Sequence, residues 1–409
     1  MRILWLKTEL LHPVDKGGKI RTFQMLKELK KDHHITYLTL DDGTAEAAAL
    51  ERASEYAHET IAIPHKTTAK FSSKFYFELA HNLVSKLPYA LQKYVSTEMR
   101  QTIEKIAHPE NFEVVVCDFL TPAVNLPANL KVPTLLFQHN VEAMIWRRHF
   151  EVAKNPAKKA FMKTQWRRMF DYEKKSCQLF NWVAAVSEED AETMRSEYGI
   201  KNVSAVPTGV DTVYFKPNPN VEKDDFNLVF TGSMDWLPNE DAIQWFTAEI
   251  LPLVRERIPQ VSLTVVGRNP FPSLVELSQK DASIVVTGRV PDVRPFMEKS
   301  SVYIVPIRIG GGTRLKIYEA MAMELPMVST TIGAEGLPVK DNEEILLRDA
   351  PRDFADAVLK LLEDKTFAAK IGAQAAQTVR EKFSWQKVSD NFAELCSKAV
   401  ERHRQNIGF

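Results

Sequence analysis

Short apolar runs rich in β-branched residues alternate along the chain with longer segments in which apolar positions recur every three or four residues. Runs that are apolar throughout are typical of strands buried on both faces of a sheet. Strands that alternate with helices predict parallel sheets with crossover helices, an α/β fold. The predicted strands are 2–7, 35–40, 60–63, 114–118, 134–138, 183–187 and 203–206 in the first half, and 227–231, 262–266, 284–287, 302–306, 327–330 and 344–347 in the second.

A polar stretch with repeated prolines separates the two halves. Residues 216–225, KPNPNVEKDD, follow TGVD at 208–211 and precede a new apolar run, which is a linker composition. Each half restarts its own strand–helix series. The sequence therefore predicts two Rossmann-like domains, 1–207 and 226–383, with a hinge at 208–225. Open parallel sheets bind ligands at the carboxyl ends of their strands, so two such domains facing each other predict a central cleft.

The strongest chemical signal is PIRIGGGTRLKIYEAMA at 306–322, where a strand ends, three glycines follow and a helix begins. Glycines allow backbone amides to approach a ligand closely. Thr313 is a favourable N-cap, and the amino end of a helix attracts anions. The alternative is an ordinary loop with solvated cations. The glycines are Gly310, Gly311 and Gly312.

Charged residues continue this motif into the predicted helix. Arg314 and Lys316 are unfavourable cations in a first helical turn, which indicates an anion that compensates them. Glu319 follows two turns in, where a carboxylate can accept two hydrogen bonds from a ribose diol. The pattern therefore favours a nucleotide-diphosphate ligand.

Together with LPMVSTTIGAEG at 325–336, this motif resembles the donor site of the GT-B-fold retaining glycosyltransferases of family 4. The resemblance extends over essentially the whole chain. It implies transfer of a sugar from a nucleotide-diphosphate sugar with retention of anomeric configuration. It also implies a final helix, 384–409, that crosses back to the amino-terminal domain. Further matching segments are TGVD at 208–211, FTGSMDWLPNEDA at 230–242, VGR at 266–268 and FSW at 383–385.

Two positions depart from the family's pattern. The family carries two glutamates separated by seven residues at the donor site; Glu319 matches the second, but Gly311 stands at the first. Ser233 opens the segment SMDW where the family often has Arg and Lys. We expect Arg314, Lys316 and the amides at 310–313 to stabilise the charge on the leaving phosphate instead.

Single residues complete the predicted site. Gly17 and Gly18 follow the first strand, and the resemblance implies that their backbone approaches the donor diphosphate or the acceptor; a simple turn is the alternative. His139 follows the strand 134–138 and matches the family's cleft histidine, which implies contact with the transferred sugar. A structural histidine is the alternative. Donor-binding residues are also expected at Ser233, Asn239 and Arg289.

Composition bounds the partners and the compartment. The formal net charge is zero, which gives no reason to expect nucleic acid. The three cysteines are far apart and form no C-x-x-C pair, which favours a reducing compartment. No signal peptide or apolar stretch of about 18 residues is visible, so we expect a cytoplasmic protein. No metal-ligand spacing or D-x-D motif occurs, which predicts a metal-independent enzyme without cofactor.

Local charge is uneven despite the neutral total. Residues 146–180 hold ten cations against three acids, and residues 66–105 mix lysines with aromatic residues. Such segments suit an interfacial helix on an anionic membrane, and a solvated helix face is the alternative. We therefore expect a carbohydrate or lipid-linked acceptor and peripheral contact with the inner face of the membrane.

The prediction from sequence is a retaining, hexosyl-type glycosyltransferase for polysaccharide or glycolipid assembly, with a UDP- or GDP-linked sugar as donor. Two alternatives stay open. One is a sugar-nucleotide epimerase or a phosphorylase on the same fold. The other is a non-catalytic nucleotide-sugar-binding protein, which the missing first glutamate suggests.

Overall fold

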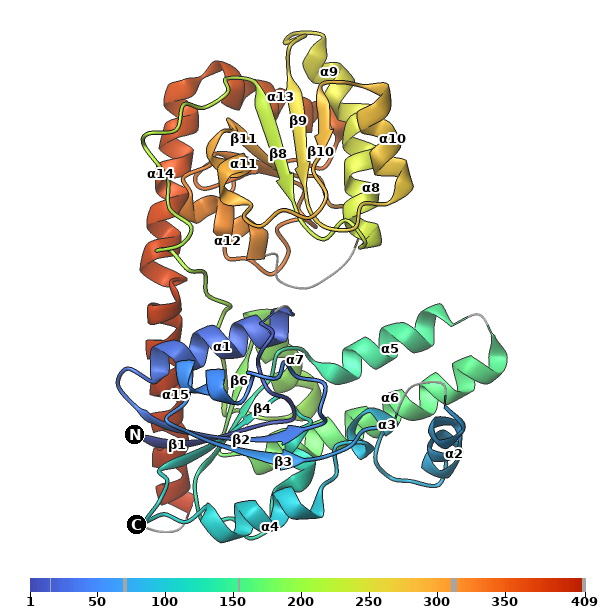
Figure 1. Ribbon diagram of the computed structural model, residues 1–409, viewed down its shortest axis with the longest axis vertical. Helices are drawn as coiled ribbons and strands as arrows, with labels where there is room; N and C mark the ends of the chain where they lie inside the picture. The colour runs from blue at the N-terminus through green and yellow to red at the C-terminus, as the bar shows by residue number, and fades with distance from the viewer. Residues whose placement is uncertain (15, 69–71, 154, 310–314, 407–409) are drawn as a thin grey trace. The chain divides into compact units, whose positions relative to one another are not determined.

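A computed structural model of the protein describes residues 1–409 except 15, 69–71, 154, 310–314 and 407–409 (Figure 1). Contacts divide the chain into two compact units. The first unit contains Met1–Pro207 and Val388–Phe409, and the second contains Thr208–Lys387. Each unit is built on one parallel sheet flanked by helices.

The first unit holds a sheet with the strand order β3-β2-β1-β4-β5-β6-β7, in which every pair of neighbours is parallel. Strand β4 is buried at all of its positions, as its uninterrupted apolar sequence predicts. The strands are β1 (Arg2–Lys7), β2 (His34–Asp41), β3 (Glu59–Pro64), β4 (Val114–Asp118), β5 (Thr134–Phe137), β6 (Trp182–Ala185) and β7 (Val203–Ala205).

Helices connect these strands, and several begin at a capping side chain. Ser187 accepts a hydrogen bond from the amide of Asp190, and Asn155 accepts one from the amide of Lys158. Helices α5 and α6 lie side by side and extend away from the sheet (Figure 1). The helices are α1 (Gly17–Leu29), η1 (Glu51–Glu55), α2 (Ser73–Asn82), α3 (Tyr89–Gln92), α4 (Thr97–Ile106), η2 (Pro122–Asn125), α5 (Glu142–Val152), α6 (Pro156–Leu179) and α7 (Glu188–Tyr198).

The second unit holds a parallel sheet with the order β10-β9-β8-β11-β12-β13. Its strands are β8 (Asn227–Thr231), β9 (Ser262–Val266), β10 (Ile284–Val286), β11 (Val302–Val305), β12 (Met327–Ser329) and β13 (Leu346–Leu347). Its helices are α8 (Leu237–Trp245), η3 (Phe246–Ile250), α9 (Leu251–Arg255), α10 (Pro272–Lys280), α11 (Arg294–Glu298), α12 (Leu315–Ala322), α13 (Pro351–Glu363) and α14 (Lys365–Lys382).

The last helix, α15 (Trp385–Asn406), belongs to the first unit from Val388 onward. There Phe392 packs against Trp5 and Phe137, with ring centroids 5.4 and 4.9 Å apart. The apolar face predicted for this helix is therefore its packing face.

The predicted hinge sequence packs within the second unit. The amide of Val210 donates to the carbonyl of Phe383 at 2.8 Å. A Cβ on Gly209 would lie 2.7 Å from the Trp385 ring, so this backbone approach requires glycine.

Candidate active site

Both sheets reverse their strand order at a point where ligands bind in open α/β sheets. In the first unit the reversal lies between β1 and β4, and in the second between β8 and β11. Most of the residues predicted from the sequence follow these strands or their neighbours at the carboxyl end.

Three polar residues meet at the carboxyl ends of β1, β4 and β5 in the first unit. Asp118, which is fully buried, accepts a hydrogen bond from the Lys7 ammonium at 2.9 Å and one from His139 Nε2 at 2.8 Å. Trp5 Nε1 at 3.0 Å and the Thr22 hydroxyl at 2.6 Å also donate to this carboxylate. Four donors therefore surround one buried anion, the condition under which a buried charge is tolerated.

Burial and the charges around His139 together set the protonation state of its imidazole. Burial lowers the pKa of His139 to about 3, with Asp118 opposing the shift and the cations Arg21 and Lys7 adding to it. Burial alone would raise the pKa of Asp118, but Lys7 and then His139 outweigh it and hold that pKa well below its usual range. The imidazole is therefore neutral, its Nε2 proton is donated to Asp118, and its Nδ1 is left as an acceptor.

Phe119 fixes the plane of the imidazole. The residue has φ of 72°, a left-handed conformation that is rare for a bulky side chain. Its ring stacks on His139 with centroids 3.8 Å apart. A Cβ on Gly18 would lie 3.1 Å from the Phe119 ring, whereas one on Gly17 would meet nothing within 4 Å. Of the predicted pair, Gly18 is thus the position where the local packing favours glycine.

A second buried carboxylate holds the loop that carries His139. Glu173 accepts hydrogen bonds from the Gln138 side chain at 2.7 Å and from the first amides of α5, Glu142 at 2.9 Å and Ala143 at 2.8 Å. The Tyr198 hydroxyl donates to it at 2.7 Å. Burial nevertheless raises the pKa of Glu173 to about 7.

In the second unit two loops pass each other so closely that side chains are excluded. A Cβ on Gly267 would lie 1.7 Å from the carbonyl oxygen of Gly232. A Cβ on Gly232 would lie 2.8 Å from both the Lys316 ammonium and the Asn239 amide. Only glycine fits at Gly267, where the close contact is with backbone, whereas a side chain at Gly232 would displace Lys316 or Asn239.

Lys316 lies over these glycines. Its ammonium donates to the Asn239 side-chain oxygen at 3.1 Å and lies 3.9 Å from the centroid of the Phe230 ring. Asn239 is 2% exposed, and its amide nitrogen donates to the Ser233 carbonyl at 2.8 Å. Asn239, which is predicted from the sequence to bind the donor, thus holds the Lys316 ammonium at the carboxyl end of β8.

Glu319 lies one turn beyond Lys316 on α12. Burial raises the pKa of Glu319 to about 7, and the Lys316 charge opposes the shift. The carboxyl group therefore titrates near neutrality, which is typical of functional sites.

The other predicted donor residues differ in their surroundings. The Ser233 hydroxyl donates to Asp235 at 2.6 Å and accepts from Arg268 at 3.0 Å. Arg289 is exposed and follows Gly288, which has φ of 71°. The predicted residues Gly310, Gly311, Gly312, Thr313 and Arg314 lie outside the described residues.

Four residues of the site were not predicted from the sequence, namely Lys7, Asp118, Phe119 and Glu173. A usable signal existed for Lys7 and Asp118, because each is a charged residue that ends a buried apolar strand. No local pattern marks Phe119 or Glu173, whose roles depend on contacts with distant residues.

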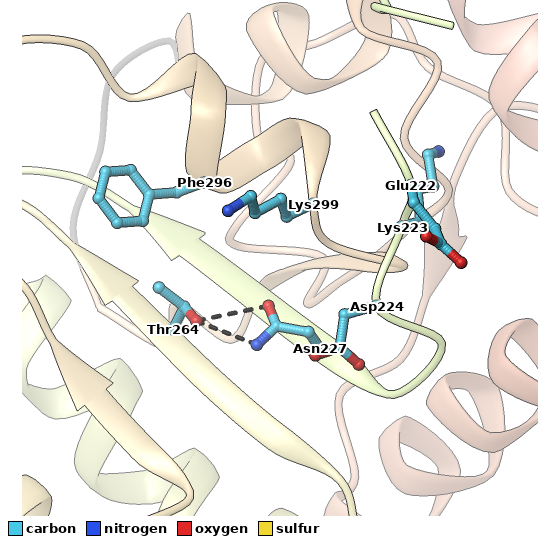
Figure 2. Close-up of a pocket in the computed structure, with 7 residues that line it drawn as sticks. All are labelled: Glu222, Lys223, Asp224, Asn227, Thr264, Phe296 and Lys299. Carbon is cyan, nitrogen blue, oxygen red and sulfur yellow. Dashed lines mark hydrogen bonds between the residues drawn. The ribbon is translucent and has the colours of Figure 1, made fainter. Parts of the chain in front are cut away.

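A pocket of about 380 Å³ in the second unit lies at the opposite end of the strands (Figure 2). It is lined by Asn227, the first residue of β8, together with Thr264 and Lys299. Asn227 and Thr264 are hydrogen-bonded to each other across its floor. This position separates it from Lys316 and Glu319.

The described residues contain neither a candidate membrane span nor a candidate metal-binding cluster. Among the helices described, none combines the length and the apolar character of a membrane span. The described side chains also include no group of three or more His, Cys, Asp or Glu residues placed to hold a metal ion.

The chain matches known glycosyltransferases over most of its length. Residues 16–214 match the family Glycosyltransferase Family 4, and residues 225–364 match Glycosyl transferases group 1. The two matches together cover most of the chain, which therefore belongs to the glycosyltransferases that these two models describe. It is an enzyme that transfers a glycosyl group from a nucleotide sugar, as predicted.

Individual relatives are distant. A 44.6 kDa protein in the cps region of Klebsiella pneumoniae is 20% identical over 95% of this chain and 97% of that one. A GDP-mannose-dependent alpha-(1-6)-phosphatidylinositol monomannoside mannosyltransferase of Mycobacterium tuberculosis is 24% identical over 52% of this chain, and the match spans only 60% of that protein. The crystal structure of Anabaena HepE with UDP shares the fold, with a TM-score of 0.66 and 14% identity over 97% of this chain and 100% of that one. The predicted GT-B fold class is thereby confirmed.

Proposed function

We propose that the second unit binds the diphosphate of a UDP- or GDP-linked sugar, and that the sugar is transferred with retention of anomeric configuration. The Lys316 ammonium, placed over the bare backbone of Gly232, carries this proposal. The amide oxygen of Asn239 orients that ammonium at the carboxyl end of β8, where a lysine can form a charge-assisted hydrogen bond to a phosphate. Similar proteins support either guanine or uracil as the base of the donor, since one is GDP-mannose-dependent and another was solved in complex with UDP.

Each remaining site residue has a proposed part. Arg314 and the amides at 310–313 join Lys316 on the diphosphate, and Glu319 accepts the ribose hydroxyls. Ser233 and Arg289 edge the nucleotide. In the first unit, the backbone of Gly17 and Gly18 contacts the donor diphosphate or the acceptor. His139 accepts a hydrogen bond from a hydroxyl of the transferred sugar through Nδ1. As the sugar leaves, negative charge on the phosphate is stabilised by the cations already in place.

Calorimetry with UDP-glucose and GDP-mannose tests this proposal. Lys316→Ala should weaken binding of the preferred donor by about tenfold or more, because it removes a charge-assisted bond worth about 1.5–3 kcal/mol. Lys370→Ala, at an exposed lysine on α14, is the matched control and should bind as the wild type does. Equal affinity in both variants would remove Lys316 from the donor site. Turnover of the donor without any acceptor would point to an epimerase instead.

We further propose that the acceptor is lipid-linked or a growing polysaccharide and that the first unit contacts an anionic membrane. Exposed apolar side chains gather on α2 and just after it, where Tyr76 is 55%, Phe77 72%, Leu83 57% and Val84 83% exposed. Arg168 of α6 donates to the carbonyls of Asn82 and Leu83, both at 2.6 Å, and so joins the two basic segments. Apolar residues beside cations are the composition of an interfacial surface.

Cosedimentation with vesicles of anionic or neutral phospholipid tests the membrane contact. The wild type should sediment with anionic vesicles at low salt, and Phe77→Ser should weaken this by about tenfold, because it removes a large apolar side chain from the interface. Leu50→Ser is the matched control, since Leu50 is 51% exposed in the same unit but outside both basic segments. A protein that stays in the supernatant with both vesicle types would contradict the membrane contact and favour a soluble acceptor.

A further inference from the structure

A cavity of about 710 Å³ lies within the first unit, away from His139. It opens beside the amino ends of β5 and β6, where Thr134 and Asn181 line it. His139 follows the carboxyl end of β5, at the other edge of the sheet. The cavity is therefore separate from the candidate active site, and its volume falls in the range of about 300–1,000 Å³ typical of small-ligand sites.

One wall of this cavity is apolar. Two polar residues of the lining are paired with each other, because Asn181 Oδ1 accepts from the Thr134 amide at 2.9 Å and from the Thr134 hydroxyl at 3.2 Å. Leu179 remains 72% exposed at its margin. An alkyl chain could cover these surfaces without leaving any of these groups unpaired. The apolar lining includes Leu87, Leu126, Leu130, Val132, Leu179 and Phe180.

The charges around the cavity have one predominant sign. Lys86, Arg168 and Lys175 line it, whereas Asp171 is the acidic residue in its lining. The Arg168 guanidinium is fixed by its hydrogen bonds to the Asn82 and Leu83 carbonyls, which leave its charge uncancelled. Lys86 and Lys175 are exposed and come from the two basic segments. An anion is the complementary partner for this rim.

We propose that this cavity binds one anionic amphiphile, with its alkyl chain against the apolar wall and its phosphate head group near Lys86 and Lys175. The occupant we infer is a single phospholipid or lysophospholipid of the membrane. Charge complementarity and an apolar wall in one small cavity favour this ligand over a protein partner. The site differs from the vesicle-contact surface on α2, because it takes up one molecule rather than resting on a bilayer.

Calorimetry with dodecyl phosphate below its micellar concentration tests the proposal on the full chain. We expect one molecule to bind, and we expect dodecyl maltoside and inorganic phosphate each to bind much more weakly. Lys175→Ala should lower the affinity about fivefold, the effect of about one cation near an anionic head group. Ala128→Glu should lower it by at least about tenfold, because it places a carboxylate at an exposed position in the lining. Lys201→Ala, at an exposed lysine outside the lining, is the matched control.

Each other result overturns the proposal. Equal binding of inorganic phosphate would indicate a simple anion site, and equal binding of dodecyl maltoside would indicate a nonspecific apolar surface. Unchanged affinity in Ala128→Glu would place the ligand elsewhere. The Phe77→Ser variant separates this inference from the membrane contact, since it should keep dodecyl phosphate binding while its vesicle binding weakens. Donor binding by the second unit should be unaffected by Ala128→Glu.

Discussion

In the first unit Lys7 is 1% exposed, and its ammonium lies 2.9 Å from the Asp118 carboxylate. In the second unit the partly exposed Lys316 donates to the neutral amide of Asn239. The charge of Lys7 is neutralised by Asp118 inside the fold. This ion pair fixes the position of Asp118 and, through the hydrogen bond to Asp118, that of His139. The ammonium of Lys316 lies beside the backbone of Gly232 at the carboxyl end of β8. One lysine therefore organises a site, and the other is placed to bind an anion.

Breaking the buried pair should have the largest effect. Lys7→Met leaves Asp118 as an uncompensated buried charge, which should lower the free energy of unfolding by about 3–5 kcal/mol. Chemical denaturation measures this change. Lys105→Met, at an exposed lysine of the same unit, should have little effect. The double variant Lys7→Met with Asp118→Asn should recover part of the loss. A decrease below about 1 kcal/mol in Lys7→Met would be typical of a surface pair and would contradict the comparison.

Removing the imidazole comes next in size. His139→Ala should reduce kcat by about 100-fold, the effect of one lost polar contact that acts in the transition state. Donor affinity should change by less than about twofold, because nucleotide binding is assigned to the second unit. Steady-state kinetics and calorimetry separate the two quantities. His149→Ala, at an exposed histidine of α5, serves as the control. Matching losses in turnover and donor affinity would instead indicate a structural histidine.

Glu319 should produce a smaller, pH-dependent effect. Its pKa is raised to about 7 by burial, so the carboxylate that can accept two ribose hydroxyls forms only as the pH rises through that value. Affinity for the nucleotide sugar should therefore increase between about pH 6 and about pH 8, by less than about tenfold. The E319Q variant should bind more weakly at the higher pH and show no pH dependence. Calorimetry at a series of pH values decides this, and a pH-dependent E319Q variant would assign the titration to another group.

The same pKa sets the sign of the stability change. Between the usual glutamate pKa and about 7 the folded protein binds more protons at Glu319 than the unfolded chain does, so the stability contributed by the protonated group is lost as the pH rises. Wild type should lose more stability than E319Q over this range.

Metal removal should have the smallest effect. Lys316, Arg314 and the amides at 310–313 are proposed to stabilise the leaving phosphate, the role that a divalent ion plays in other transferases. Activity in EDTA should therefore equal activity without it. Loss of activity that magnesium or manganese restores would show that these cations do not suffice.

Much of the fold could be predicted from the sequence because parallel strands buried on both faces appear in the chain as continuous apolar runs. Every predicted strand is present, with ends that differ by at most two residues. The motif at 306–322 indicated Lys316 and Glu319 because glycines and cations at a helix start are unusual together. The sequence could not show which of Gly17 and Gly18 is required to be glycine. Only the three-dimensional contact between Gly18 and Phe119 distinguishes them.

The amino-acid sequence alone determined the two parallel sheets, the division near residue 208 and the family, because these depend on hydrophobic periodicity and on motifs that are local in the chain. Only the tertiary structure decided how the polar residues are used. Asp118 meets Lys7, which is 111 positions away, and Asn239 meets Lys316 across 77 positions. Pairings over such distances depend on strand order and packing, which no local pattern encodes. They decide which lysine pairs with a buried carboxylate and which lies beside an amide at the end of a strand.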